Sequence, residues 1–248
     1  MKKNRFSKII NFRVVGLSIL IAFILLTYSK TAVSDTVDIT LAQGWNFISL
    51  PILPNNNNTQ DVLSGLTGTK WLYWYDVSIE DPMARWKIYD SNAPSEVNTL
   101  TSMEPNRAYW LWVASEQTLS VAGYKPAVNS VTLYPGWNMV SFQDLSGTVE
   151  NVLANMTLTD VRVMYAFYPF EDPMARWKIW DDVPETPNTF TNIEPTKGYY
   201  LWSEIGLPTI PTTPADGIWV NPVPEPSTML FLVSTLLGLT GLGWKFKK

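Results

Sequence analysis

The sequence contains no cysteine and no histidine among its 248 residues. Without cysteine the chain has no disulfide bond, no thiolate nucleophile and no sulfur ligand for zinc. Without histidine it lacks the side chain that most often acts as a general base or binds a metal. These absences exclude the Ser-His-Asp and Cys-His catalytic arrangements and the HExxH zinc motif. Carboxylate pairs and cations bound by oxygen ligands remain possible.

Basic residues are scarce in the middle of the chain. The formal net charge is −4, but six of the 18 lysines and arginines precede Asp35 and three follow Trp244. Between Asp35 and Pro222, nine basic residues therefore stand against 21 acidic ones, a net charge of −12. A surface of this sign repels a phosphate backbone, so the sequence disfavours nucleic acid as a partner.

The N-terminus has the three parts of a secretory signal peptide. A basic head, MKKNRFSKIINFR, precedes 14 apolar residues, VVGLSILIAFILLT, and small residues follow at Ala32 and Ser34. We therefore expect residues 1–34 to form a signal helix that is removed after Ser34. An uncleaved membrane anchor is the alternative, although the apolar stretch is short for a bilayer core of about 30 Å.

The C-terminus combines three elements in a fixed order. Residues 223–248 contain Pro224-Glu225-Pro226, then the 17 apolar residues 228–244, then a tail with three lysines. At about 1.5 Å per residue the apolar segment is just long enough for a transmembrane helix, and the lysines should keep the tail cytoplasmic. Both prolines hold the tripeptide extended, because neither donates a backbone hydrogen bond.

The order of these elements resembles the PEP-CTERM sorting signal, and the resemblance covers residues 223–248 only. It implies recognition by exosortase, a membrane transpeptidase of Gram-negative bacteria that make exopolysaccharide. It also implies that Pro224, Glu225 and Pro226 are a processing site in a substrate and are not catalytic. The tail departs from the family in carrying lysines and aromatic residues instead of an arginine cluster. An ordinary tail anchor with proline at its entry is the alternative.

Between these ends the chain repeats itself after roughly 91 residues. GWNFISL returns as GWNMVSF, and EPNRAYWLW returns as EPTKGYYLW. The block EDPMARWKI occurs twice without a change, at residues 80–88 and 171–179. Because the matching segments keep their order, the chain carries a tandem duplication. We expect one repeat in residues 35–125 and the other in residues 126–205.

Each copy has the pattern of β-strands. Val37, Ile39 and Leu41 fall on one face of a strand, and the aromatic runs KWLYWYD, RWKIYD and AYWLWV favour further strands. TQDVLSGL and TVENVLANM each predict one short helix, with Thr59 or Thr148 as the N-cap. The predicted fold class is all-β, with two tandem small β-sandwich or barrel-like repeats. The GWN and YWLW motifs also resemble a β repeat of secreted bacterial surface proteins.

Residues 206–222 separate the repeats from the sorting signal. Pro208, Pro211 and Pro214 recur every three residues. This spacing favours an extended polyproline conformation of about 3.1 Å per residue. We predict a stalk that holds the repeats away from the membrane. The alternative is that ADGIWVNP, within this segment, forms the last strand of the second repeat.

Three interpretations of EDPMARWKI compete. In the first, its carboxylates act as acid and base on a glycosidic bond, but the adjacent Glu80 and Asp81 point apart and do not span a sugar. In the second, cationic and aromatic side chains bind an acidic polysaccharide. In the third, Asp81-Pro82 forms a turn, while Trp86 and Trp177 anchor the core. We favour the third. Without an EF-hand pattern, a calcium site is disfavoured.

The second interpretation names a set of candidate ligand-binding residues. Strand alternation places the cations of the block on one face and its Trp on the other. Between the copies Trp74 becomes Ala166 and Asp76 becomes Tyr168, which predicts a variable and wetter face. At the alternate positions of the same strand, the residues are large and apolar in both copies, which predicts a buried face. The candidates are Trp74, Trp110, Trp112, Arg85, Lys87, Arg176, Lys178, Trp180 and Trp202.

The sequence as a whole predicts an exported bacterial surface protein with a structural or adhesive role in an exopolysaccharide matrix. A carbohydrate-binding module that uses exposed aromatic residues is the alternative, and a glycan-active enzyme is a more distant one. We expect no enzymatic activity, no cofactor and no metal. The expected partners are exosortase, the secretion machinery, the membrane and an exopolysaccharide. The expected route passes through an inner-membrane intermediate to the envelope, the cell surface or the extracellular matrix.

Overall fold

The computed structural model describes residues 34–126, 131–143, 145–156, 158, 160–183 and 187–204. Contacts divide the chain into two compact units, Met1–Ser34 and Asp35–Lys248, and both repeats belong to the second. The predicted signal peptide (apart from Ser34), the stalk and the sorting signal lie outside the described residues. Within the described ranges, no helix combines the length and the apolar character that crossing a bilayer requires.

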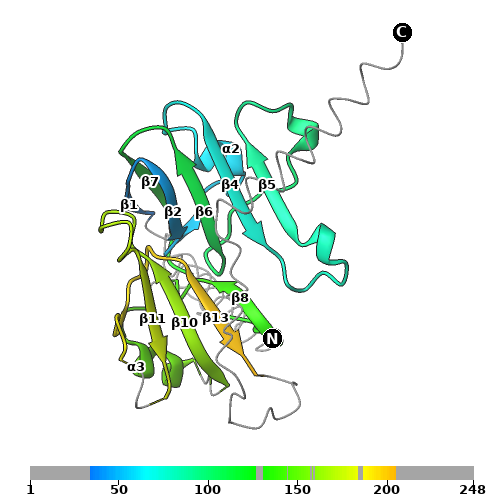
Figure 1. The fold of residues 1–248 in the computed structure, drawn as a ribbon. Coiled ribbons are helices and arrows are strands. Elements are labelled where there is room, and N and C mark those ends of the chain that lie inside the picture. Colours follow the sequence, from blue (N-terminus) through cyan, green and yellow to red (C-terminus); the bar gives the residue numbers. More distant parts are fainter. Residues whose placement is uncertain are drawn as a thin grey trace, which may run out of the picture. The chain divides into compact units, whose positions relative to one another are not determined.

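The first copy consists of antiparallel sheets and one short helix, in agreement with the all-β prediction (Figure 1). Its elements are β1 (Asp35–Leu41), β2 (Gly44–Ser49), β3 (Leu53–Pro54), α2 (Thr59–Val62), β4 (Lys70–Tyr75), the 3₁₀ turn η1 (Pro82–Ala84), β5 (Trp86–Asp90), the 3₁₀ turn η2 (Ser95–Val97), β6 (Ala108–Val113) and β7 (Gln117–Tyr124). One sheet has four strands in the order β2-β6-β4-β5, and the other has three in the order β1-β7-β3.

The second copy repeats the four-stranded sheet. Its elements are β8 (Gly136–Val140), β9 (Gly147–Thr148), α3 (Val149–Asn155), β10 (Val161–Phe167), β11 (Trp177–Asp181), β12 (Asn192–Ile193) and β13 (Tyr199–Ser203). The strand order β8-β13-β10-β11 matches β2-β6-β4-β5 element for element (Figure 1). In addition, β9 pairs with β12. The duplication of the sequence is therefore also a duplication of the four-stranded sheet, whereas the three-stranded sheet β1-β7-β3 has no counterpart among the described residues of the second copy.

One helix per copy forms where the sequence predicts it, but only one of the two predicted caps is right. Thr148 caps α3, because its hydroxyl accepts the backbone N–H of Asn151 at an N···O distance of 3.3 Å. In the first copy the cap is Asn58, whose side-chain oxygen accepts the N–H of Gln60 at 3.0 Å. Thr59 is instead the first helical residue, with a buried hydroxyl. The prediction of Thr59 as the cap was wrong by one residue.

The GWN motif closes the turn between β1 and β2 in the first repeat and stands at the start of β8 in the second. Gly44 has a φ of 92° and its counterpart a φ of 89°, a region that favours glycine. The side chain of Asn46 accepts the N–H of Ala42 and donates to its carbonyl oxygen, both at 2.9 Å. Asn138 makes the same pair of hydrogen bonds with Tyr134, at 2.9 and 2.8 Å. The asparagine side chain thus makes the two hydrogen bonds, one accepted and one donated, that a backbone partner would otherwise make.

The EP…Y motif is held by a buried tyrosine. The hydroxyl of Tyr109 accepts the backbone N–H of Glu104 at 2.6 Å, and that of Tyr199 accepts the N–H of Glu194 at 2.8 Å. Both tyrosines are 0% exposed. Burial raises the pKa of each phenol, so both stay neutral and keep these contacts at physiological pH.

Side chains cover the outer edges of the two four-stranded sheets. Asn98 and Thr99 accept backbone N–H groups of β5 at 2.8 and 2.9 Å. Asn188 and Thr189 accept the equivalent N–H groups of β11 at 2.7 Å each. An edge strand with free N–H groups pairs readily with another chain, so the repeated Asn-Thr dipeptide protects each sheet from such pairing.

Candidate functional site

A shared aromatic cluster joins the two copies. Each repeat has its own apolar core on one face of its four-stranded sheet. A third cluster lies on the opposite faces and draws on both repeats. Its buried members are Phe47, Tyr73, Ala108, Trp110, Met139, Phe167 and Tyr200. Both faces of each sheet are therefore covered, one by its own repeat and the other largely by the partner repeat.

The centre of the shared cluster is a stack of rings. The ring centroid of Phe47 lies 4.6 Å from that of Trp110 and 4.9 Å from that of Tyr200, with interplanar angles of 19° and 24°. The indole N–H of Trp110 donates to the hydroxyl of Tyr200 at 3.0 Å, and burial raises the pKa of this hydroxyl. Trp177 adds an edge contact 5.8 Å from Trp110. The indole nitrogen of Trp110 and the hydroxyl of Tyr200 are thus paired inside the interface.

Backbone pairing also crosses between the repeats. The N–H of Gly198 donates to the carbonyl oxygen of Phe47, and that of Ser49 to Thr196, both at 3.0 Å. A Cβ atom on Gly198 would lie 2.8 Å from the Cβ of Ala108. Ala108 occupies the same position in the first copy as Gly198 in the second. The close approach of the two sheets therefore requires glycine on one side.

Burial corrects the predicted exposure of two candidate residues. Trp110 is 0% exposed, so it does not present a ring to a sugar at the surface. Trp180 is 5% exposed within the core of the second repeat, where its indole N–H donates to Glu150 at 2.9 Å. Strand alternation groups side chains by face but leaves open what covers each face, and both faces are covered.

The expectation of a wetter face around Trp74 was wrong for a similar reason. Trp74 is half-buried between the first core and the shared cluster, and the guanidinium of Arg107 lies 3.9 Å from its ring centroid. Ala166 is 0% exposed. In the second copy Lys197, the counterpart of Arg107, lies 4.1 Å from the ring of Tyr168. The aromatic partner has thus moved two positions along the strand, and the cation–π contact persists.

Trp112 and Trp202 are half-buried and contact neighbouring tryptophans. The ring of Trp112 lies 4.6 Å from that of Trp71, and the ring of Trp202 lies 5.3 Å from that of Trp137. Part of each ring is consequently occupied by protein. A role for these two residues in ligand binding stays a prediction.

The candidate cations stabilise the hairpins that carry them. Arg85 donates through Nε to the carbonyl oxygen of Ile79 at 2.6 Å, and Arg176 donates in the same way to Glu171 at 3.1 Å. Lys178 forms an ion pair with the carboxylate of Glu171 at 2.6 Å. Lys87 is half-buried on β5 opposite Trp74. Their part in binding a polysaccharide also stays a prediction.

EDPMARWKI forms a turn in both copies. The carboxylate of Asp81 accepts the N–H of Met83 at 2.9 Å, and Asp172 does the same for Met174 at 2.9 Å. Trp86 and Trp177 pack against the shared cluster rather than the core of their own repeat. Trp177 contacts the other copy, with its ring centroid 5.8 Å from that of Trp110, whereas the ring of Trp86 contacts Tyr75 of its own copy. Among the described residues, no group of three or more acidic side chains is placed to hold a metal ion.

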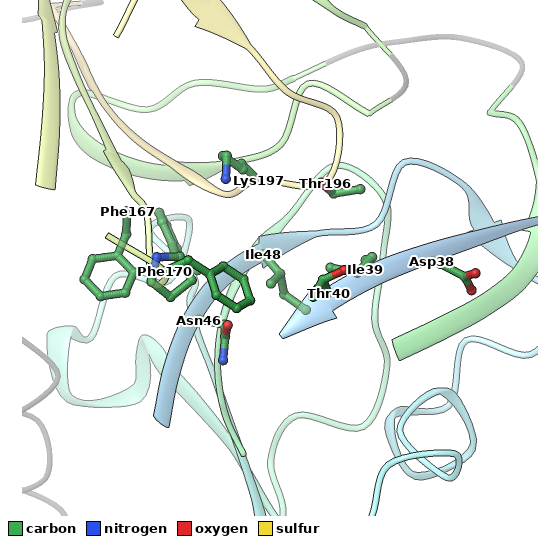
Figure 2. A pocket seen from close by; sticks show the side chains of 11 residues that line it. Asp38, Ile39, Thr40, Asn46, Ile48, Phe167, Phe170, Thr196 and Lys197 are labelled. Atoms are coloured by element: carbon green, nitrogen blue, oxygen red, sulfur yellow. The ribbon is translucent and has the colours of Figure 1, made fainter. Parts of the chain in front are cut away.

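Sequence reasoning missed a hollow where the two copies meet. It has a volume of about 250 Å³ and lies between β1, β2, the turn after β10 and the segment that precedes β13 (Figure 2). Its walls come from residues as far apart as Asp38 and Lys197. The only sequence signal is Phe170, an aromatic residue in a turn where the first copy has Ile79.

No family model, curated protein or solved structure matches this chain. Function must therefore be argued from the arrangement of its residues.

Proposed function

We propose that the chain is an exported bacterial surface protein, anchored to the envelope or processed there by exosortase, with a structural or adhesive role in an exopolysaccharide matrix. The observation that carries the structural role is the shared aromatic cluster. Trp110, a candidate for an exposed sugar-binding platform, is instead buried between the repeats. The two copies thus form one body within the described residues.

The contacts in this body favour durability outside the cell. Aromatic pairs contribute about 0.5–1.5 kcal/mol each beyond the burial of their area. Phe47, Trp110 and Tyr200 form such pairs, and the indole of Trp110 is hydrogen-bonded as well. Covered sheet edges limit unwanted pairing with neighbouring chains. A body of this kind needs no disulfide bond, which agrees with the absence of cysteine.

The sequence of the two ends supports the location. A signal peptide directs export, and a processing site followed by an apolar segment and lysines holds the C-terminus at the membrane. Pro224, Glu225 and Pro226 are the residues that exosortase would recognise. They lie outside the described residues, so this part of the proposal rests on sequence alone.

The test is cell fractionation with mass spectrometry of the mature termini. The expected product begins at Asp35, lies in the envelope or matrix, and has a C-terminus trimmed near Pro226. Replacing Pro224-Glu225-Pro226 by alanine should leave the tail attached, whereas alanine at Pro208 and Pro211 is the matched control and should not. Equal processing of both variants would rule out exosortase. Full-length protein in the cytosol would overturn the location.

Carbohydrate binding is the second candidate function. The observation that favours it is the hollow between the repeats, where the ring of Phe170 is 56% exposed. The half-buried Trp74, Trp112 and Trp202 are the alternative location for the same activity.

A further inference from the structure

The hollow at the junction of the repeats combines an exposed ring with polar groups on several sides. Figure 2 shows Phe170 at one end and Asp38 at the other, with Thr40 and Ile48 between them and Lys197 and Thr196 on another wall. Since both repeats supply walls, the site exists only in the paired body. The volume of about 250 Å³ lies below the range of drug-sized pockets, which begins at about 300 Å³.

We infer that this hollow binds a neutral hexopyranose unit of a polysaccharide. The inference rests on the proposed surface role and names its ligand class. A hexopyranose has one face of C–H groups and a rim of hydroxyls. The C–H groups pack against the negative face of an aromatic ring, and the hydroxyls need donors and acceptors. The hollow supplies both kinds of contact.

Phe170 supplies the apolar contact. Phe170 is 56% exposed. An exposed phenyl ring adds nothing to the two cores or to the shared cluster, from which it is absent. Packing against the C–H face of a sugar would remove this apolar surface from water.

The polar walls are fixed in position. One carboxylate oxygen of Asp38 accepts the hydroxyl of Ser120 at 2.6 Å, which orients the group. Lys197 is held by Glu194, whose carboxylate lies 3.5 Å from its ammonium, and by the ring of Tyr168. Asp38 and Lys197 therefore line the hollow from opposite repeats, and contacts within its own repeat hold each of them, so that little freedom is lost on binding.

The charges favour a neutral sugar over an acidic one. Asp38 is exposed and repels a uronic acid, while the positive charge of Lys197 is already paired with Glu194. The central part of the chain also carries a net charge of −12. The ligand class is thus different from the acidic polysaccharide that the cations of EDPMARWKI indicated.

Binding of oligosaccharides to the purified chain, measured by calorimetry, tests the inference. The probes are neutral gluco-, manno- and galacto-oligosaccharides and, for comparison, oligomers of uronic acids. At least one neutral probe should bind, and Phe170→Ala should weaken it at least tenfold. Met174→Ala is the matched control, because this side chain is 95% exposed on the same hairpin and lies outside the hollow. It should leave the affinity unchanged.

Other results would overturn the site and leave the surface role standing. Binding that survives Phe170→Ala but is lost on Trp112→Ala would move the site to the tryptophans. Binding of the uronic oligomers alone, or of no probe, would contradict the ligand class. Asp38→Asn tests the carboxylate separately from the ring of Phe170. It should weaken binding of the neutral probe and leave the midpoint of thermal unfolding unchanged. The location of the protein is tested independently by fractionation.

Discussion

Gly198→Ala tests whether the two sheets meet as closely as the shared cluster requires. The new Cβ would lie 2.8 Å from the Cβ of Ala108, 3.0 Å from the carbonyl oxygen of Ile48 and 3.1 Å from the ring of Phe47. Overpacking of this kind costs about 1–3 kcal/mol. The φ of Gly198 is not positive, so alanine recovers about 0.4–1 kcal/mol through the unfolded chain. Taken at the middle of both ranges, the expected net loss is about 1–2 kcal/mol.

Thermal unfolding followed by near-ultraviolet circular dichroism measures this loss. For a domain of this size the midpoint should fall by about 2–8 °C. Gly65→Ala is the control, because no atom lies within 4 Å of its added Cβ and its φ is not positive. Adding Ala108→Gly to Gly198→Ala removes the closest contact and should recover part of the midpoint. If Gly198→Ala is as stable as the parent, the sheets do not approach each other as described.

Two further predictions concern the buried tyrosines. Trp110→Phe leaves the hydroxyl of Tyr200 buried without its donor and should cost about 1–3 kcal/mol of unfolding free energy. Tyr200→Phe should recover part of this loss in a double-mutant cycle measured by denaturant unfolding. An equal loss in Trp112→Phe, at a half-buried site, would contradict the assignment. Burial raises the pKa of Tyr109 and Tyr199 above the value of about 10 in an unfolded chain, so the folded state retains more protons above that pH. The contribution of these tyrosines to the free energy of unfolding is fully present below about pH 10 and should fall as the pH rises further. Equal denaturation midpoints at about pH 8 and about pH 11 would contradict this expectation.

Features set by local chemistry followed from the sequence. The all-β class, the duplication, one helix per copy and the Asp-Pro turn of EDPMARWKI were all predicted, and the helices and the turn depend on residues close together in the chain. Alternation along the first strand was also right, since Ile39 and Leu41 lie in the first core. These patterns succeed because strand periodicity and turn chemistry act over a few residues.

Features set by contacts between distant residues did not follow. The burial of Trp110 depends on Tyr200, 90 positions away, and the hollow joins Asp38 to Lys197. The role of Asn98 and Thr99 at the edge of β5 was also missed, although the Asn-Thr dipeptide recurs in the second copy. A repeated dipeptide in a loop indicates a shared constraint, but only the neighbouring strand reveals which one.

The sequence by itself determined that two β repeats stand between apolar ends, and that every second aromatic residue shares a face. The tertiary structure decided what each face meets. Alternation assigns a side chain to one side of a sheet, because successive Cβ atoms point in opposite directions. It carries no information about the body that covers that side. In this chain the aromatic face of one repeat packs on that of the other, and this contact buries Trp110, a candidate ligand-binding residue, in a shared core.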